Sequence, residues 1–249
     1  EKEALSILEK LGFQKKGRSL IAPPLRVDIN NIEDIAEEIA RIQGYENLTP
    51  KAPSIAIGAA KEDELIILKD RVRNILIGAG FNEVYNYSLV SKQETAVAPI
   101  ATLGNQISPS YLPVELANPI SKQFAFLRDS LSSGLMKNLK DNLRFFNEVK
   151  VFEIGKVFSR NQDNNSEIAV LGLALSGKNA ILELKGLADT LFQGLGLLDY
   201  FWPDLNLENN LLKANEALRL ETDHRVFGYL GSLAGIEGAM LEINLEKLL

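Results

Sequence analysis

The chain has 249 residues, of which 46% are hydrophobic and 24% are charged, and its formal net charge is −6. This composition is typical of a globular protein with one large or two modest domains, and the negative charge argues against binding nucleic acid through a broad basic surface. Cysteine is absent and His224 is the single histidine, which excludes disulfides, thiolate metal sites and His-rich metal sites.

No segment predicts a membrane span or a secretory signal. The longest strongly apolar run, residues 168–177, is shorter than the roughly 20 residues that a helix needs to cross a bilayer, and the first residues lack the charged and apolar regions of a signal peptide. Without cysteine the chain suits a reducing compartment, so we expect a cytoplasmic protein. It begins at Glu1, without an initiator methionine and inside a predicted helix, and we therefore expect a fragment of a longer protein.

The N-terminal region predicts two helices joined by an extended segment. Residues 2–12 place their apolar side chains on one helical face, and Gly12 ends the pattern. Two prolines in "SLIAPPLRVDI" exclude helix there. The second helix is expected to begin near Asn30 or Asn31, either of which can cap it, and to end before Gly44.

A linker and a second, longer region follow. The stretch "NLTPKAPSIAIGAAKED" has prolines and small residues without a period, which predicts a linker over 51–61 and a domain boundary. Apolar residues then recur at helical spacing in "ELIILKDRVRNILIGAG" until Gly80, and "FNEVYNYSLV" predicts a strand. Another helix is expected over 132–146.

The remainder predicts mainly strands. The runs "EVKVFEIGKVFSR" and "EIAVLGLALSG" are separated by the turn-rich "NQDNNS", which predicts an antiparallel hairpin of strands 150–158 and 167–176. "ILELKGLADTLFQGLGL" has helical periodicity, and "EALRLETD", "VFGYLGSLAG" and "AMLEINLE" predict three more short strands. Together these elements predict an α+β fold with a mainly antiparallel sheet flanked by helices.

One acidic segment, "RVDINNIEDIAEEIARIQGY", contains Asp28, Asp34, Glu37 and Glu38. At about 100° per residue the three helical acids lie on the face opposite to the isoleucines. One interpretation is structural, because acids stabilise a helix start and Glu37 can pair with Arg41 four residues on. The other is a hard-cation site, because Mg²⁺ binds one or two carboxylates plus water and Asp28 could add an oxygen from the preceding segment. Spacing alone leaves both open.

The same segment resembles the end of the B5 domain in the β subunit of bacterial phenylalanyl-tRNA synthetases. "ILEKLGF" and then "RVDINNIEDIAEEIARIQGYENL" are similar to the family pattern R-x-D-I followed by D-L-x-E-E-I-x-R-I-x-G-Y. The resemblance continues in family order through "GFNEVYNYSLVS", "NPISKQFAFLRDSLSSGLMKNLKDNLRF", "VKVFEIGKVF" and "LELKGLADTLFQGLGL". It departs from the family at "KANEA" and "YLGSLAG", where turns containing His and Pro are usual.

The resemblance implies an organisation and a metal site. Residues 1–50 would be the C-terminal part of a winged-helix-like B5 domain, 51–61 a linker, and 62–249 a class II synthetase catalytic-like domain that lacks catalysis. Mg²⁺ would be bound at the contact with the α subunit, and the implied ligands are Asp28, Asp34, Glu37 and Glu38.

The implied function is that of a β-subunit fragment of phenylalanine–tRNA ligase. It would support the ATP-dependent charging of tRNA(Phe) through assembly with the catalytic α subunit in an α2β2 heterotetramer. ATP would be used by the holoenzyme and is not expected to bind this fragment, tRNA(Phe) would be reached through the holoenzyme, and no membrane is involved.

The residues themselves predict no catalytic site. Class II adenylation needs an arginine on the first strand of the long hairpin and another on a later element. "VKVFEIGKVF" offers Lys150 and Lys156 but no arginine, no arginine follows Arg225, and lysine lacks the planar bidentate fork. His224 in "ETDHRVF" is expected in a solvent-facing turn, and the spaced glycines of "GYLGSLAG" are expected to ease a strand pair rather than bind a dinucleotide.

Three basic residues remain as contact candidates, and a fourth as a loop anchor. Lys137, Lys140 and Arg144 are spaced i, i+3 and i+7 on the predicted helix, which fits either a tRNA or subunit contact or a solvated face. Arg128 in "FLRDS" is expected to anchor its loop rather than touch substrate.

Two rival hypotheses stay open at this level. One is a magnesium-dependent enzyme of another class built on the four carboxylates, although no general base or phosphate-binding glycine loop completes it. The other is a free-standing, synthetase-like regulatory or binding paralogue.

Overall fold

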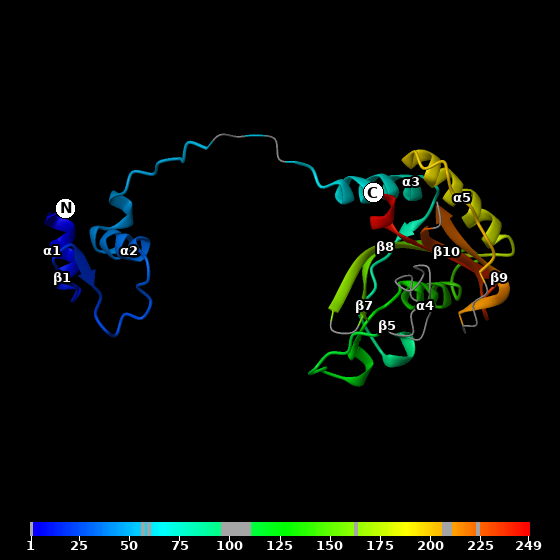
Figure 1. Cartoon of the computed structure of the whole chain (residues 1–249), viewed down its shortest axis with the longest axis horizontal. Coiled ribbons are helices and arrows are strands. Elements are labelled where there is room, and N and C mark those ends of the chain that lie inside the picture. Colours follow the sequence, from blue (N-terminus) through cyan, green and yellow to red (C-terminus); the bar gives the residue numbers. More distant parts are fainter. Residues whose placement is uncertain are drawn as a thin grey trace. The chain divides into compact units, whose positions relative to one another are not determined.

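The computed structural model of the chain describes residues 2–55, 58, 61–95, 111–161, 164–205, 211–222 and 225–249. The chain divides into two compact units, Glu1–Ala60 and Lys61–Leu249. The division falls at the end of the segment 51–61, and Figure 1 labels several elements of each unit. None of the helices in this described part of the chain has the length and apolarity needed to cross a membrane.

As far as its residues are described, the first unit contains two helices and a short antiparallel hairpin. Helix α1 ends where Gly12 adopts a φ of 88°, and the neighbouring Leu8 and Phe13 are buried. The hairpin, which turns at Gly17, was not predicted, because its two three-residue strands are almost entirely exposed and carry no apolar alternation. The elements are α1 (Lys2–Lys10), β1 (Gln14–Lys16), β2 (Ser19–Ile21), α2 (Ile32–Gln43) and the 3-10 turn η1 (Tyr45–Asn47).

The second unit is built on one seven-stranded sheet with the order β3-β7-β8-β11-β10-β9, and β5 pairs with β7 outside this path. Only the short β3–β7 pair is parallel, so the expectation of a mainly antiparallel sheet is confirmed. The strands are β3 (Asn82–Glu83), β5 (Tyr111–Leu112), β7 (Lys150–Asn161), β8 (Asn164–Ser176), β9 (Leu212–Thr222), β10 (Arg225–Leu233) and β11 (Gly238–Asn244).

The predicted long hairpin is present and is longer than expected. Strands β7 and β8 pair without a register shift from Lys150 opposite Leu175 to Asn161 opposite Asn164. The turn-rich stretch between the two apolar runs therefore continues the ladder nearly to the hairpin tip, beyond the predicted limits of 158 and 167.

The single strand predicted over "FNEVYNYSLV" is wrong. Only β3 and the two-residue strand β4 (Leu89–Val90) form, and β4 pairs with β6 (Phe126–Leu127) in a separate small sheet. Between them Tyr85 and Tyr87 are 82% and 83% exposed. Aromatic residues favour strands in general, but within this segment only Asn82 and Glu83 belong to the main sheet.

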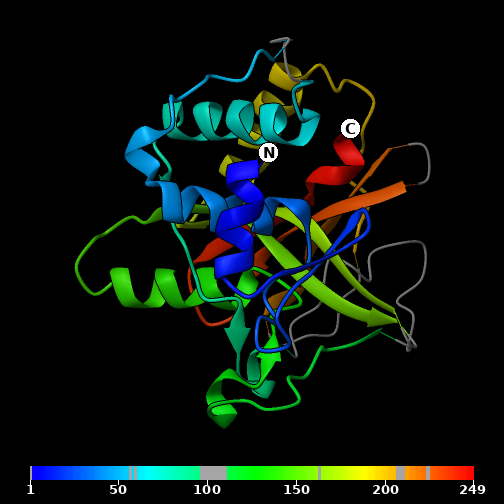
Figure 2. The same cartoon turned by 90° about the vertical axis from the view of Figure 1, so that its left-hand side faces the viewer.

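In the described residues of this unit, three helices cover the sheet: α3 (Glu64–Gly78), α4 (Ser132–Asn142) and α5 (Ala180–Leu195). Figures 1 and 2 show α4 on the opposite side of the sheet from α3 and α5. Helix α4 ends four residues before the predicted limit of 146, where Phe145 and Phe146 follow in a turn closed by the carbonyl of Asn142.

Alternation along the strands separates two apolar cores. On β7, Phe152 and Ile154 belong to the core under α3 and α5, whereas Val151 and Val157 belong to the core under α4. This follows from the period of two, which sends successive side chains to opposite faces of a sheet. The second unit is therefore a three-layer α+β structure with two filled faces.

Candidate functional site

Two arginines form ion pairs with two of the carboxylates in the acidic segment. Glu38 is only 5% exposed, and Arg26 Nη2 donates to its Oε1 at 2.7 Å while Arg41 Nη2 donates to its Oε2. Arg26 also binds Asp28, with Nη2 donating to Oδ2 at 2.6 Å. These hydrogen bonds lower the pKa of Asp28 to about 2 through Arg26, and the pKa of Glu38 to about 2 through Arg26 first and Arg41 second.

The other two carboxylates have separate environments. Asp34 Oδ2 accepts the backbone N–H groups of Asn30 and Asn31, both at 2.7 Å, and these bonds lower the pKa of Asp34. Asp34 thus acts as the N3 side chain of a capping box, which satisfies backbone donors at the helix start. Glu37 is exposed. In the part of the chain that the structure describes, no three His, Asp or Glu side chains are grouped so as to hold a metal ion.

This arrangement does not fit Mg²⁺. Mg²⁺ requires near-octahedral oxygen ligands, but both oxygens of Asp28 and both of Glu38 accept guanidinium hydrogen bonds, and one oxygen of Asp34 is used by the helix start. A cation between Asp28 and Glu38 would have to displace Arg26. The four-carboxylate magnesium site stays a prediction that the described side chains do not support. Sequence reasoning overlooked Arg26, although it lies only two residues before Asp28.

Arg128 joins three segments of the second unit. Its Nη1 donates to Glu153 Oε1 at 2.6 Å, and both side chains are buried. Arg128 also donates to the carbonyl oxygens of Lys156 at 2.9 Å and Asn86 at 3.3 Å, while Asn86 Nδ2 donates to Glu153 Oε2 at 2.7 Å. The Nε and Nη1 groups of Arg128 are engaged by the protein, which supports the interpretation of this residue as a loop anchor.

The three basic residues of the predicted stripe do not share one helix. Lys137 and Lys140 are exposed on α4, but Arg144 lies beyond its last residue, Asn142, because the helix is shorter than expected. Arg144 makes a distant ion pair of 4.0 Å with Asp141. A continuous i, i+3, i+7 stripe is therefore wrong, and of the three only Lys137 lines the cavity in front of α4.

A buried polar cluster was missed by sequence reasoning. Glu242 on β11 is fully buried and accepts hydrogen bonds from Tyr229 at 2.5 Å, Ser130 at 2.9 Å, Ser132 at 3.1 Å and the Leu131 N–H at 2.7 Å. Burial raises the pKa of Glu242, and burial followed by the nearby Glu242 raises that of Tyr229. The only sequence signal is the glutamate within the apolar strand "AMLEINLE".

Asp129 adjoins this cluster, and one of its carboxyl oxygens is buried without a hydrogen bond to another described residue. Its residue exposure is 5%, and its Oδ1 has no hydrogen-bond partner among the described residues. Burial first and the charge of Glu242 next raise the pKa of Asp129 to about 8. A carboxyl with such a pKa is protonated over much of the acidic to neutral range.

The prediction that the first hairpin strand carries no arginine is wrong for the complete strand. Strand β7 extends to Asn161 and includes Arg160, which is exposed. Because side chains alternate, Arg160 lies on the face of Phe152, under α3 and α5, whereas Ser159 lies on the α4 face. The α4 face of β7 therefore still carries no arginine.

The space between α4 and the sheet is filled by the protein itself. Leu135, Tyr229 and Met240 are each 0% exposed in the core that joins α4 to the strands. The two lysines that the sequence offered are bound elsewhere: Lys150 to Glu148 at 3.1 Å, and Lys156 to Glu167 at 2.5 Å.

Two further sequence expectations concern β10 and its turn. A Cβ at Gly228 would lie 2.6 Å from the carbonyl oxygen of Glu242 on the adjacent strand, so the glycine permits close strand pairing as expected. The solvent-facing turn expected for His224 lies outside the described residues.

The family models and the relatives named below agree on one family. Residues 48–243 match the model of the phenylalanyl tRNA synthetase beta chain CLM domain, and residues 1–45 match that of the tRNA synthetase B5 domain. The phenylalanine–tRNA ligase beta subunit of Clostridium acetobutylicum is 33% identical over 245 residues, which cover 93% of this chain and 29% of that protein. The beta subunit of Bdellovibrio bacteriovorus is 25% identical and covers 100% of this chain and 34% of that protein.

Solved structures show the fold alone. A pyrrolysyl tRNA synthetase from Desulfitobacterium hafniense has a TM-score of 0.57 and 14% sequence identity, with 100% of this chain and 86% of that chain covered. The second unit is accordingly like a class II synthetase fold. The chain spans about a third of the length of the beta subunits named above. With its main family match covering residues 48–243, the chain belongs to the phenylalanyl-tRNA synthetase β-chain family.

Proposed function

We propose that this chain is a segment of the β subunit of a phenylalanine–tRNA ligase, and that it supports the ATP-dependent charging of tRNA(Phe) by assembly with a catalytic α subunit. The family match supports the subunit assignment. The activity and substrates belong to the whole ligase, because the chain spans only about a third of its relatives.

The observation that carries the noncatalytic role is the filled α4 face of the sheet. Leu135, Tyr229 and Met240 are fully buried there, and a substrate would have to displace apolar side chains from a close-packed core. The only arginine on β7 lies on the other face of the strand, and Arg128 is held by Glu153. Arg219 on β9 lies opposite Tyr229 and so shares this face, but it forms an ion pair with Glu221 at 3.2 Å. Adenylation needs a guanidinium that is free to bind a phosphate in a bidentate manner.

The further parts of the proposal follow the β-chain assignment. Residues 1–50 form the C-terminal part of a winged-helix-like B5 domain, and the partner is the α subunit in an α2β2 heterotetramer of the cytoplasm. ATP and tRNA(Phe) are bound by the holoenzyme. No step is assigned to Mg²⁺ on the acidic segment, since Arg26 binds two of the four carboxylates that would hold it.

Neither rival hypothesis gains support from the structure. A metal-dependent enzyme needs clustered ligands, and the described residues contain no such group. A free-standing paralogue would function without a synthetase partner, so α-subunit binding separates it from the proposed role.

Pyrophosphate exchange tests the noncatalytic role. The purified chain should give no phenylalanine-dependent ATP–pyrophosphate exchange above a no-enzyme blank, while the intact ligase measured in parallel should give it. Exchange by the chain that requires phenylalanine and persists through repurification would overturn the proposal.

A further inference from the structure

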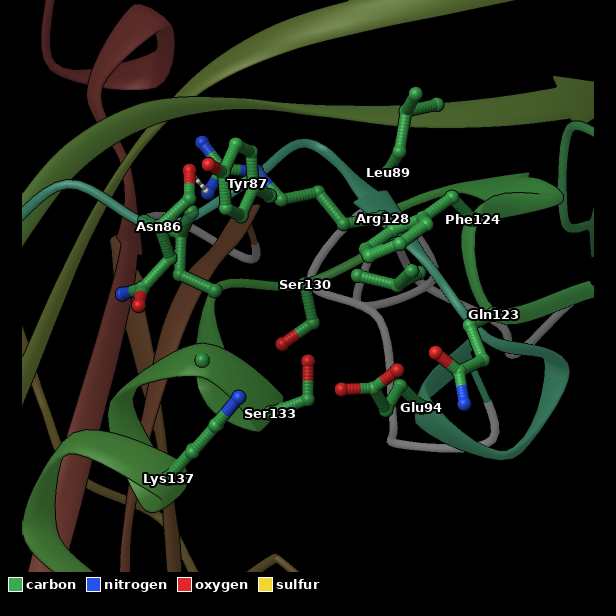
Figure 3. A pocket seen from close by; sticks show the side chains of 13 residues that line it. Asn86, Tyr87, Leu89, Glu94, Gln123, Phe124, Arg128, Ser130, Ser133 and Lys137 are labelled. Atoms are coloured by element: carbon green, nitrogen blue, oxygen red, sulfur yellow. Dashed lines mark hydrogen bonds between the residues drawn. The ribbon is translucent and has the colours of Figure 1, made fainter. Parts of the chain in front are cut away.

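A small cavity in the second unit has the chemistry of a binding site that the proposed function does not use. Its volume is about 100 Å³, and its walls come from the segment 86–90, the 3-10 turns η2 (Lys92–Thr95) and η4 (Lys122–Phe124), the loop 128–131 and the first turns of α4. Figure 3 shows the oxygens of Glu94, Ser130 and Ser133 directed toward one another, with the Lys137 amine at the side.

The cavity presents one uncommitted charge of each sign. Lys137 makes no ion pair with any other described residue, whereas the charge of Arg128 is neutralised by Glu153 at 2.6 Å. Glu94 uses Oε2 to accept Ser91 N at 2.8 Å and Ser91 Oγ at 2.7 Å, and its Oε1 has no partner among the described residues. An ammonium and a carboxylate oxygen are therefore both available to a ligand.

Neutral groups complete the lining. The Ser133 hydroxyl and the Gln123 side-chain amide have no hydrogen-bond partners in the described residues, so both remain available to a ligand. The rings of Tyr87 and Phe124 pack edge to face, with 6.4 Å between their centroids, and form an apolar wall. Ser130 differs, because its hydroxyl already donates to Glu242 and accepts from the Ser132 N–H.

Size and charge together select the ligand class. A dry cavity of about 150 Å³ holds a benzene molecule of six heavy atoms, so a cavity of about 100 Å³ accommodates a molecule of roughly four to six heavy atoms. A simple anion would pair with Lys137 but be repelled by the Glu94 carboxylate. A simple cation would pair with Glu94 but be repelled by the Lys137 ammonium. A zwitterion can satisfy both.

We propose that this cavity binds a small zwitterionic α-amino acid of the size of glycine or alanine. Its carboxylate binds Lys137 and the Ser133 hydroxyl, and its ammonium binds Glu94 and the Gln123 amide oxygen. The site is independent of the proposed subunit function, because none of its four polar contacts takes part in the filled α4 core.

Amide NMR of the whole chain tests the site. Glycine and L-alanine should shift the resonances of Ser133, Gly134 and Lys137 saturably, with dissociation constants of the order of 1 mM. Acetate and methylammonium at equal concentrations each satisfy one charge and should bind at least tenfold more weakly. L-Phenylalanine, which is too large for the cavity, should leave these resonances unchanged.

Matched variants separate the cavity from general charge effects. Lys137→Gln should weaken binding at least tenfold, whereas Lys140→Gln, at an exposed position of the same helix but outside the cavity lining, should leave it unchanged. Ser133→Ala provides a second, conservative variant that should weaken binding several-fold. The proposal is overturned if glycine and L-alanine cause no saturable shifts, if acetate or methylammonium binds as well as they do, if L-phenylalanine binds in the cavity, or if Lys137→Gln keeps full affinity.

Discussion

Replacing Asp129 by asparagine should remove a pH-dependent destabilisation of the fold. Burial and the neighbouring Glu242 raise the pKa of Asp129 from its ordinary 3.8 to about 8, so between these values the folded chain binds a proton that the unfolded chain has released. Unfolding then releases that proton and becomes more favourable as pH rises. The stability associated with protonated Asp129 is complete below about pH 4 and is lost progressively up to about pH 8.

The magnitude follows from the proton affinity. One pKa unit corresponds to about 1.36 kcal/mol, so across three pH units below the folded pKa the Asp129 contribution changes by about 4 kcal/mol. The asparagine side chain cannot ionise but keeps the shape of the acid. The difference in the free energy of unfolding between Asp129→Asn and the parent should therefore rise by about 4 kcal/mol from pH 5 to pH 8. Any term that the unpaired amide group adds to this difference does not depend on pH.

Urea unfolding followed by circular dichroism at pH 5, 6, 7 and 8 measures this difference. Asp141→Asn is the control, because Asp141 is exposed and should give parallel pH profiles for variant and parent. If Asp129→Asn and the parent also change in parallel, then Asp129 is ionised in the folded chain and the reasoning from burial is wrong.

The remaining predictions concern packing and ion pairs. Arg128→Met alone should lower the free energy of unfolding by about 3–5 kcal/mol, because it leaves the buried Glu153 carboxylate without its partner. The double variant Arg128→Met with Glu153→Met should recover most of this loss in urea unfolding. Equal losses in the single and double variants would contradict this prediction. Leu135→Ala should cost about 2–5 kcal/mol and Leu182→Ala, which is 68% exposed, about 0.5 kcal/mol or less; similar thermal midpoints for the two would refute the assignment of the α4 core. Magnesium chloride added to the isolated chain should leave the side-chain carboxyl NMR resonance of Glu38 unchanged, because two arginines already bind it; a saturable shift of that resonance at constant ionic strength would show that the cation displaces Arg26.

Regular elements with a clear period could be predicted from the sequence. The hairpin of β7 and β8 and the helix α5 follow from apolar patterns bounded by turn residues, and both are present. The short strands β3 and β4 could not be delimited, since Tyr85 and Tyr87 favour a strand but lie outside any sheet. Local propensity does not report which segments find a pairing partner.

The candidate site shows the same division. The positions of the carboxylates on α2 were apparent from helical geometry, but their partners were not, because Arg26 reaches Glu38 across twelve positions of the chain. Likewise Ser130 donates to Glu242 although more than a hundred residues separate them along the chain. Such pairs depend on tertiary structure, and they cannot be predicted from periodicity or from spacing along the chain.

Arg160 shows how an element's length changes a chemical conclusion. The sequence argument stopped at residue 158 and found no arginine on the strand, whereas the strand continues to Asn161. The conclusion about the α4 face is retained only because alternation places Arg160 on the other face.

Association with the α subunit is the most direct test of the central claim, that this chain acts by assembly rather than catalysis. Sedimentation velocity of the chain mixed with the phenylalanyl-tRNA synthetase α subunit of the same organism should show a faster boundary containing both proteins. Two independent boundaries at every mixing ratio, with both proteins folded, would contradict the account.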